Sequence, residues 1–180
     1  FCLQKRFVNE IPMDTDMVCL CNPNNPTGQL IDREVLEQVA DYCQKTDTCL
    51  LLDECFHDFL EEGSVHTLLP RVKENPKLFV LRAFTKMYGM AGLRLGYAIC
   101  SDTELIRRME QVTQPWNVSV PAQAAGIAAA REQEFVAVSR QMITEQKKLL
   151  LAGLEAAGAK VYGSAANYIF FRAAPGFDTR

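Results

Sequence analysis

Polar side chains stand at the ends of three short apolar segments, and these are the groups in the chain that could do chemistry. Asn25 lies in a turn after the first segment, Asp53 closes the second, and the pair Thr85-Lys86 follows the third. In α/β sheets, ligands bind beyond the carboxyl ends of the strands. We therefore predict that an amide, a carboxylate, a hydroxyl and an amine converge on one ligand.

Each of these features has a simpler explanation when it is taken alone. The sequence from Asn22 to Gly28 is rich in turn-forming residues, an Asp at a strand end often caps a helix, and most lysines are solvated surface charges. Only the combination favours a ligand site, because one chain carries all of these groups at successive predicted strand ends.

The elements that would position these groups alternate between short apolar runs and longer amphipathic ones. Apolar runs cover residues 17–21, 49–53, 78–82 and 94–100, and the spacing of apolar residues predicts a helix over 32–45. Continuously apolar strands are typical of a mostly parallel sheet with helices on both faces. The sequence therefore predicts an α/β fold.

A second helix is predicted after this set of strands. Ser101-Asp102 opens it, and Leu105, Ile106 and Met109 are expected to point inward. Farther along, a long helical pattern ends at Gly158, a residue type that commonly terminates helices.

The patterns divide the chain into three predicted parts. Residues 1–130 form the central and C-terminal part of a large domain, and 131–158 form a connecting helix. Residues 159–180 start a small α+β domain, with a strand or hairpin arm between Lys160 and Arg172.

Composition restricts the class of partner. The chain has 180 residues, 48% of them hydrophobic, with a formal net charge of -3 and no basic stripe suited to nucleic acid or an anionic membrane. No apolar run is long enough to span a bilayer. Seven cysteines lie mostly in apolar runs, and two histidines are too few for a zinc site. We expect a cytoplasmic, metal-free protein with reduced cysteines that acts on a small molecule.

The motifs at the strand ends resemble those of the fold-type I pyridoxal-phosphate enzymes, the aspartate aminotransferase superfamily of class I and II. The resemblance rests on Asn25-Pro26-Thr27-Gly28, on Asp53-Glu54, and on Phe84-Thr85-Lys86 followed by Gly92-Leu93-Arg94-Leu95-Gly96-Tyr97. The intervals from Asn25 to Asp53 and from Lys86 to Arg94 are those of the family. The resemblance covers essentially the whole chain and implies an aspartate aminotransferase-like large domain that binds the cofactor.

The resemblance also implies a role for each of five residues. Lys86 would form a Schiff base with pyridoxal 5'-phosphate and then move the α-proton of the substrate, and Asp53 would keep the pyridine nitrogen protonated. Asn25 would donate to the phenolic oxygen of the ring. Arg94 and Thr85 would hold the phosphate.

Two positions depart from the family pattern. Phe56 stands where many aminotransferases have a Tyr that contacts the ring oxygen, and Ala83 stands where a hydroxyl residue is common. In the C-terminal part, Asn167 is a candidate to approach the substrate. Arg172 is interpreted as a surface or strand-end charge and not as the residue that binds the substrate carboxylate.

The resemblance bears on completeness and assembly as well. The family's glycine-rich phosphate loop and stacking aromatic lie upstream of anything equivalent to Phe1, and its carboxylate-binding arginine lies downstream of the last residue. We therefore expect a fragment that does not turn over alone. The full-length enzyme is expected to be a homodimer, in which neighbouring subunits complete each active site.

Within the superfamily, the segment Asp53-Glu54-Cys55-Phe56-His57-Asp58-Phe59 is similar to the branch of histidinol-phosphate aminotransferases and threonine-phosphate decarboxylases. Phe56, Thr85 and residues 114–118 favour the decarboxylase side. Transamination of an amino acid or amino-acid phosphate is nevertheless the first prediction, because it is the commoner activity. The alternatives are a threonine-phosphate-type decarboxylase and a non-catalytic aminotransferase-like domain of a regulator, and the full set of cofactor residues argues against the latter.

Overall fold

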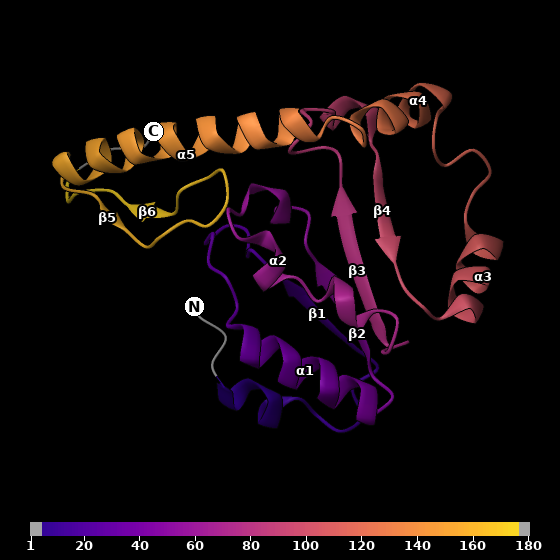
Figure 1. The fold of residues 1–180 in the computed structure, drawn as a ribbon. Helices are drawn as coiled ribbons and strands as arrows, with labels where there is room; N and C mark the ends of the chain where they lie inside the picture. Colours follow the sequence, from indigo (N-terminus) through magenta and orange to yellow (C-terminus); the bar gives the residue numbers. More distant parts are fainter. Residues whose placement is uncertain (1–4, 177–180) are drawn as a thin grey trace.

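A four-stranded sheet lies at the centre of the computed structural model, which describes residues 5–176 (Figure 1). The strand order is β1 (Met17–Cys21), β2 (Cys49–Asp53), β3 (Leu78–Ala83) and β4 (Gly96–Ile99). β1, β2 and β3 are parallel, whereas β4 is antiparallel to β3. The predicted α/β fold with a mostly parallel sheet is therefore confirmed. The predicted domains also include residues 1–4 and 177–180, which lie outside the described residues.

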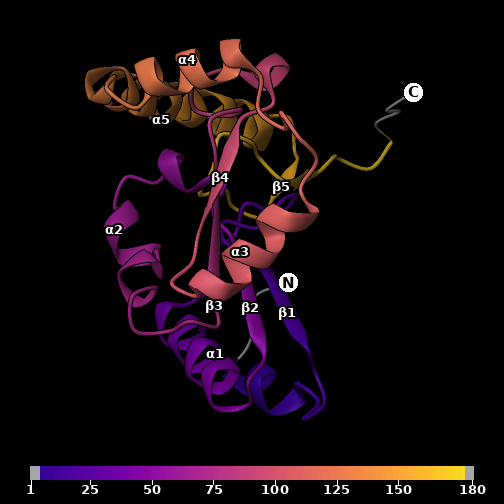
Figure 2. The same cartoon turned by 90° about the vertical axis from the view of Figure 1, so that its right-hand side faces the viewer.

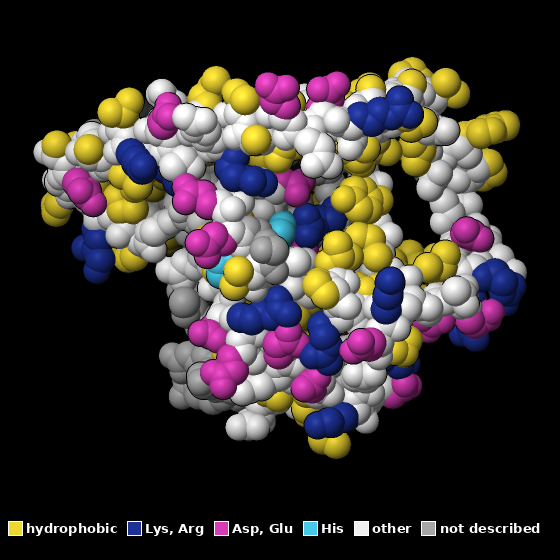
Figure 3. Space-filling view, viewed as in Figure 1, with side chains coloured by type: hydrophobic (Ala, Val, Ile, Leu, Met, Phe, Trp, Pro, Cys, Tyr) yellow, Lys and Arg dark blue, Asp and Glu magenta, His cyan; other side chains and the backbone are white. Residues whose placement is uncertain are grey.

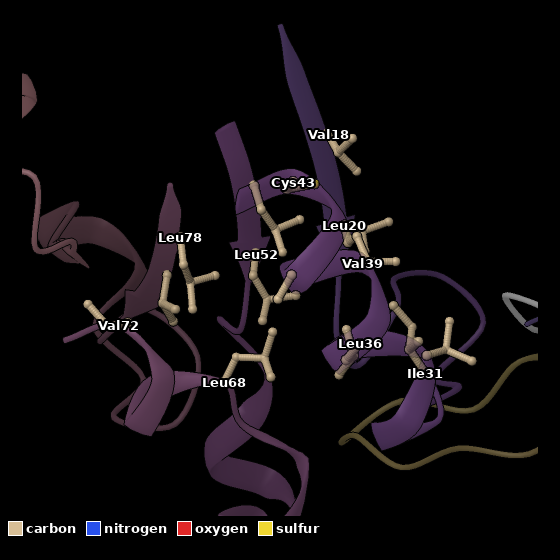
Figure 4. Close-up of a cluster of buried hydrophobic side chains, with 14 of the residues drawn as sticks. Val18, Leu20, Ile31, Leu36, Val39, Cys43, Leu52, Leu68, Val72 and Leu78 are labelled. Carbon is tan, nitrogen blue, oxygen red and sulfur yellow. The ribbon is translucent and has the colours of Figure 1, made fainter. Parts of the chain in front are cut away.

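Helix α1 (Arg33–Lys45) covers one face of this sheet. It begins after Asp32, whose carboxylate accepts a hydrogen bond from the backbone N–H of Glu34. Figure 4 shows its apolar stripe packed on side chains of β1, β2 and β3. The buried set on the helix is Val35, Leu36, Val39, Ala40 and Cys43, and on the strands Val18, Leu20, Leu50, Leu52, Leu78 and Val80. Each fully buried Leu or Val contributes about 1.5–3 kcal/mol, so this layer is the main core.

Helix α3 (Thr103–Val112) lies on the opposite face of the sheet (Figure 2). A cavity of about 810 Å³, lined by Leu51, Phe79, Leu105 and Met109 among others, separates it from the strands. Helices therefore stand on both faces, but they pack unequally. Met109 points toward the sheet as expected, because it lines this cavity, but it is not packed there and stays 43% exposed.

The fourth strand begins later than the apolar run 94–100 predicts. The short 3-10 helix η4 (Ala91–Leu93) comes first, and Arg94 then takes a left-handed conformation with φ 55°. This turn reverses the chain so that β4 starts at Gly96 and runs antiparallel to β3. An apolar run does not by itself show where such a turn ends and a strand starts.

Short helices make the other connections before β4. They are η1 (Lys5–Glu10) before β1, and η2 (His57–Phe59), α2 (Gly63–His66) and η3 (Leu69–Arg71) between β2 and β3. Helix α4 (Val120–Ala129) follows α3. The connection between α3 and α4 stands away from the sheet, and the space-filling view shows an opening there (Figure 3). Trp116 in this connection and Val112 at the end of α3 are strongly exposed.

The C-terminal part consists of one long helix and a short hairpin. Helix α5 (Gln133–Ala156) is followed by Gly158, which has φ 77° and terminates the helix as predicted. β5 (Lys160–Val161) and β6 (Phe171–Arg172) pair in an antiparallel sheet of their own, which agrees with the predicted hairpin arm. Within residues 5–176, none of the helices combines the length and apolar character needed to cross a membrane.

Candidate functional site

One cleft of about 560 Å³ lies at the carboxyl ends of β2 and β3. Asn25, Asp53, Thr85, Lys86 and Arg94 all line it, so the structure brings together the five residues that the sequence predicts to bind the cofactor. Its volume lies within the range of about 300–1,000 Å³ that is typical of small-molecule sites. The cleft lies where ligands bind in α/β sheets.

Asp53 is the last residue of β2 and presents its carboxylate to this cleft. The carboxylate accepts a hydrogen bond from the backbone N–H of Cys55 at 2.9 Å. Burial and a hydrogen bond to Asp53 raise the pKa of the Cys55 thiol to about 12, so the thiol stays protonated beside the carboxylate. These contacts hold Asp53 in one orientation at the wall of the cleft.

The turn after β1 brings Asn25 to the cleft. Asn22, which is fully buried, closes the turn because its side-chain oxygen accepts from the backbone N–H of Ile31 at 2.9 Å. Gly28 has φ 66°, and a Cβ at this position would lie 3.0 Å from the Cα of Ser164. The turn therefore requires glycine both for its conformation and for its close approach to the C-terminal segment.

Lys86 and Arg94 bring two cations to the cleft. The ammonium of Lys86 lies 5.4 Å from the centroid of the Phe56 ring, and Arg94 donates a hydrogen bond to the backbone oxygen of Ala91 at 3.2 Å. Within residues 5–176, neither cation forms an ion pair with a carboxylate. The left-handed backbone at Arg94 is uncommon for a residue other than glycine, and such conformations cluster at ligand sites. The cleft thus suits an anionic ligand.

Sequence reasoning missed Tyr168, which connects the cleft to the C-terminal segment. Its ring meets Phe56 edge to face at 5.0 Å between centroids, and its hydroxyl donates to the backbone oxygen of Asn24 at 2.7 Å. Burial raises the pKa of this hydroxyl to about 12. The neighbouring Asn167, expected near the substrate, lines a separate cavity of about 200 Å³ against α5. Arg172 is exposed at the end of β6, as interpreted.

Arg82 lines the cleft itself, and sequence reasoning missed it as well. A signal was present, because Arg82 is a charged residue at the end of an otherwise apolar strand.

The structure shows no candidate metal site in the part of the chain that it describes. No three His, Cys, Asp or Glu side chains are arranged there to hold a metal ion.

Similarity to known proteins identifies the family. Residues 5–176 match the family described as aminotransferase class I and II. The chain belongs to this aminotransferase family. It is 36% identical over 160 residues to threonine-phosphate decarboxylase of Salmonella typhimurium, and 36% identical over 155 residues to a histidinol-phosphate aminotransferase of Brevibacillus brevis. The alignments cover 88% and 86% of this aminotransferase chain but 43% and 42% of the relatives, so it spans less than half of their length.

Solved aminotransferases share the fold. The histidinol-phosphate aminotransferase of Clostridium acetobutylicum matches with a TM-score of 0.90 at 27% identity, covering 97% of this chain and 52% of that one. The enzyme of Sinorhizobium meliloti, solved in complex with pyridoxal-5'-phosphate, matches with a TM-score of 0.80 at 24% identity, covering 88% and 42%. Pyridoxal phosphate is the cofactor of class I and II aminotransferases, and the resemblance seen in the motifs is confirmed.

The donor set of the cleft fits this cofactor. The cleft offers Arg94 and Thr85 to a phosphate, Asp53 to a ring nitrogen, Asn25 to a ring oxygen and Lys86 to an aldehyde. Each chemical group of pyridoxal phosphate thus has a complementary side chain in the same cleft.

The two departures from the family pattern lie in the cleft as well. Phe56 and Ala83 both line it, so neither supplies a hydroxyl group there. The remaining donors are therefore the ones available to the ring oxygen and the phosphate.

Proposed function

We propose that this chain is the cofactor-carrying region of a pyridoxal-phosphate-dependent aminotransferase acting on an amino acid or an amino-acid phosphate. The observation that carries the proposal is the convergence of Asn25, Asp53, Thr85, Lys86 and Arg94 on one cleft. The membership of the chain in the class I and II family supports it.

Each side chain has a distinct task in this proposal. Lys86 Nζ binds the cofactor aldehyde and moves the proton at the substrate α-carbon. Asp53 keeps a proton on the ring nitrogen, because a carboxylate stabilises the cationic form beside it. Asn25 donates to the ring oxygen, and Arg94 and Thr85 hold the phosphate. The bound cofactor supplies an electron sink for the bonds of the α-carbon.

The first test is the visible spectrum of the natural full-length protein mixed with pyridoxal phosphate, recorded before and after borohydride reduction. We expect a band that borohydride removes and that Lys86→Ala lacks. Lys73→Ala is the matched control, because Lys73 is exposed and does not line the cleft. A band that persists in Lys86→Ala contradicts the assignment of this lysine. A wild-type protein without a band supports instead the non-catalytic domain of a regulator.

Decarboxylation of an amino-acid phosphate is a second candidate, favoured by the similarity to threonine-phosphate decarboxylase and by Phe56. The same cofactor supports either reaction, and the bond that breaks depends on how the substrate is oriented. Two assays separate the candidates: transfer of the amino group from histidinol phosphate to a 2-oxo acid, and release of carbon dioxide from threonine phosphate. Carbon dioxide release without amino transfer would select the decarboxylase.

We also propose that the full-length protein is a cytoplasmic homodimer. The dimer is supported by the resemblance to the superfamily, and the cytoplasmic location by cysteine usage. Six cysteines within the described residues are free thiols. Light scattering coupled to size exclusion tests the dimer, and a monomeric mass would contradict it.

A further inference from the structure

A buried ionic network lies directly behind the cleft. Glu54 follows Asp53 in the chain, but its side chain points to the opposite face of the sheet and is fully buried. Glu54 Oε2 accepts from Arg82 Nε at 3.0 Å and Nη2 at 2.6 Å, and from the hydroxyl of Thr67 at 2.8 Å. Oε1 accepts from the backbone N–H of Leu68 at 3.1 Å. Both oxygens of this buried carboxylate are therefore satisfied.

Arg82 extends the network to the C-terminal helix. Its Nη1 donates to Asp58 Oδ1 at 3.1 Å. The backbone oxygen of Asp58 accepts two hydrogen bonds from Arg140 of α5, at 3.0 Å from Nε and 2.9 Å from Nη2. One guanidinium group thus joins β2, β3 and η2, and through Asp58 it reaches α5.

The place of Arg82 lets it act on the cofactor residues. Arg82 lines the cleft and binds Glu54, the residue next to Asp53. It lies near the end of β3, and Lys86 follows shortly after that strand ends. A buried ion pair is weak evidence for stability, because desolvation offsets the attraction. A planar guanidinium with two fixed partners does, however, define their relative positions.

We infer that Arg82, oriented by Glu54 and Asp58, is a positioning residue that sets Asp53 and Lys86 relative to each other and couples their placement to α5. The inference rests on the proposed function. Arg82 positions Asp53 and Lys86 indirectly. Its partners lie on separate elements, so its hydrogen bonds fix the ends of β2 and β3 relative to each other.

The test compares wild-type, Arg82→Lys and Arg71→Lys in the natural full-length protein. The lysine keeps the charge of Arg82 but cannot bridge Glu54 and Asp58 with a planar fork. Arg71 is the matched control, because it also pairs with two carboxylates, on α1, and does not line the cleft. The probe is pyridoxal phosphate, followed by its visible absorption, its visible circular dichroism, and thermal unfolding of the cofactor-free protein.

We expect Arg82→Lys to bind pyridoxal phosphate about tenfold more weakly, comparable to the loss of an outer partner at a metal site. The visible circular dichroism should fall, because it reports how the ring is oriented. Arg71→Lys should match wild type in both. Wild-type affinity and dichroism in Arg82→Lys would overturn the inference and leave the proposed function intact. A wild-type protein without a visible band would refute the proposed function and, with it, this role of Arg82.

Asp58→Asn is the second variant, and it decides the outcome if Arg82→Lys does not fold. It removes the charge of one partner and keeps the pair between Arg82 and Glu54. We expect both its affinity for pyridoxal phosphate and its visible circular dichroism to fall below the wild-type values. If both equal the wild-type values, the inference fails.

Discussion

The two faces of the sheet are built from the same strands but have different environments. Alternate residues of β1, β2 and β3 point to α1 and are almost fully buried, and the polar residues that end this face, Asn22, Glu54 and Arg82, are enclosed by hydrogen bonds. The intervening residues face α3 across a cavity of about 810 Å³, and this face ends in Asp53 and the cleft.

The difference shows that a single step along a strand separates a structural carboxylate from one available to a ligand. Asp53 and Glu54 are adjacent, and because side chains alternate across a strand they point to opposite faces. Glu54 is buried and bound by a guanidinium, whereas Asp53 contacts the cleft. The packed face stabilises the fold and leaves the other face available for binding.

Replacing Glu54 and Asp53 in turn should give the largest difference in stability between the two faces. In the 180-residue chain, we expect Glu54→Ala to lower the free energy of unfolding by about 3–5 kcal/mol, because it removes the fully buried carboxylate that pairs with Arg82 and leaves that guanidinium only the partly exposed Asp58. Asp53→Ala should lower it by only about 1 kcal/mol, the worth of one hydrogen bond. Urea denaturation measures both. Equal losses would show that the two faces do not differ in this way.

Thiol labelling compares the faces without mutation. Burial, together with the nearby Cys49, raises the pKa of Cys43 to about 11, so about one thiol in a thousand is ionised at pH 8. Cys19 is exposed on the other face. We expect iodoacetamide to modify Cys19 readily and Cys43 only after unfolding, as resolved by peptide mass spectrometry. Rapid modification of Cys43 in the folded chain would argue against a tightly packed α1 face.

Two neighbouring leucines on β2 test the packing directly. Leu50→Ala should lower the free energy of unfolding by about 2–5 kcal/mol, since it leaves a cavity in the core beneath α1. Leu51→Ala, on the face that borders the cavity below α3, should cost about 1 kcal/mol. Each variant is the control for the other, because both substitutions remove the same side-chain atoms. A larger loss for Leu51→Ala would reverse our assignment of the core.

The smallest effect is expected at Met17, which is 53% exposed at the start of β1. Met17→Lys should change the free energy of unfolding by no more than about 0.5 kcal/mol, because the lysine remains solvated. Val18→Lys is the matched change on the α1 face and should destabilise strongly, since it buries an unpaired charge. Thermal unfolding compares the two variants, and a strong loss in Met17→Lys would mean that this side chain is packed.

Most of the fold could be predicted from local patterns. The first three strands and α1 were predicted nearly to their observed bounds, because a run of apolar residues and a three-and-four spacing reflect periodicity within one element. The start of β4 was predicted less accurately, because the turn through Arg94 is set by backbone geometry that hydropathy does not report. The low burial of Met109 could not be predicted for a related reason: an amphipathic pattern shows which side of a helix is apolar, but not how closely that side packs.

In the candidate site, too, some features follow from local sequence and others depend on the tertiary structure. Motif spacing by itself determined the family and the five residues that meet in the cleft, because strand ends in a parallel sheet meet at one edge. Only the tertiary structure decided that Arg82 binds Glu54 and Asp58, and that Tyr168 reaches Asn24. These contacts join residues far apart in the chain, and their geometry depends on how separate elements pack, which no local pattern encodes.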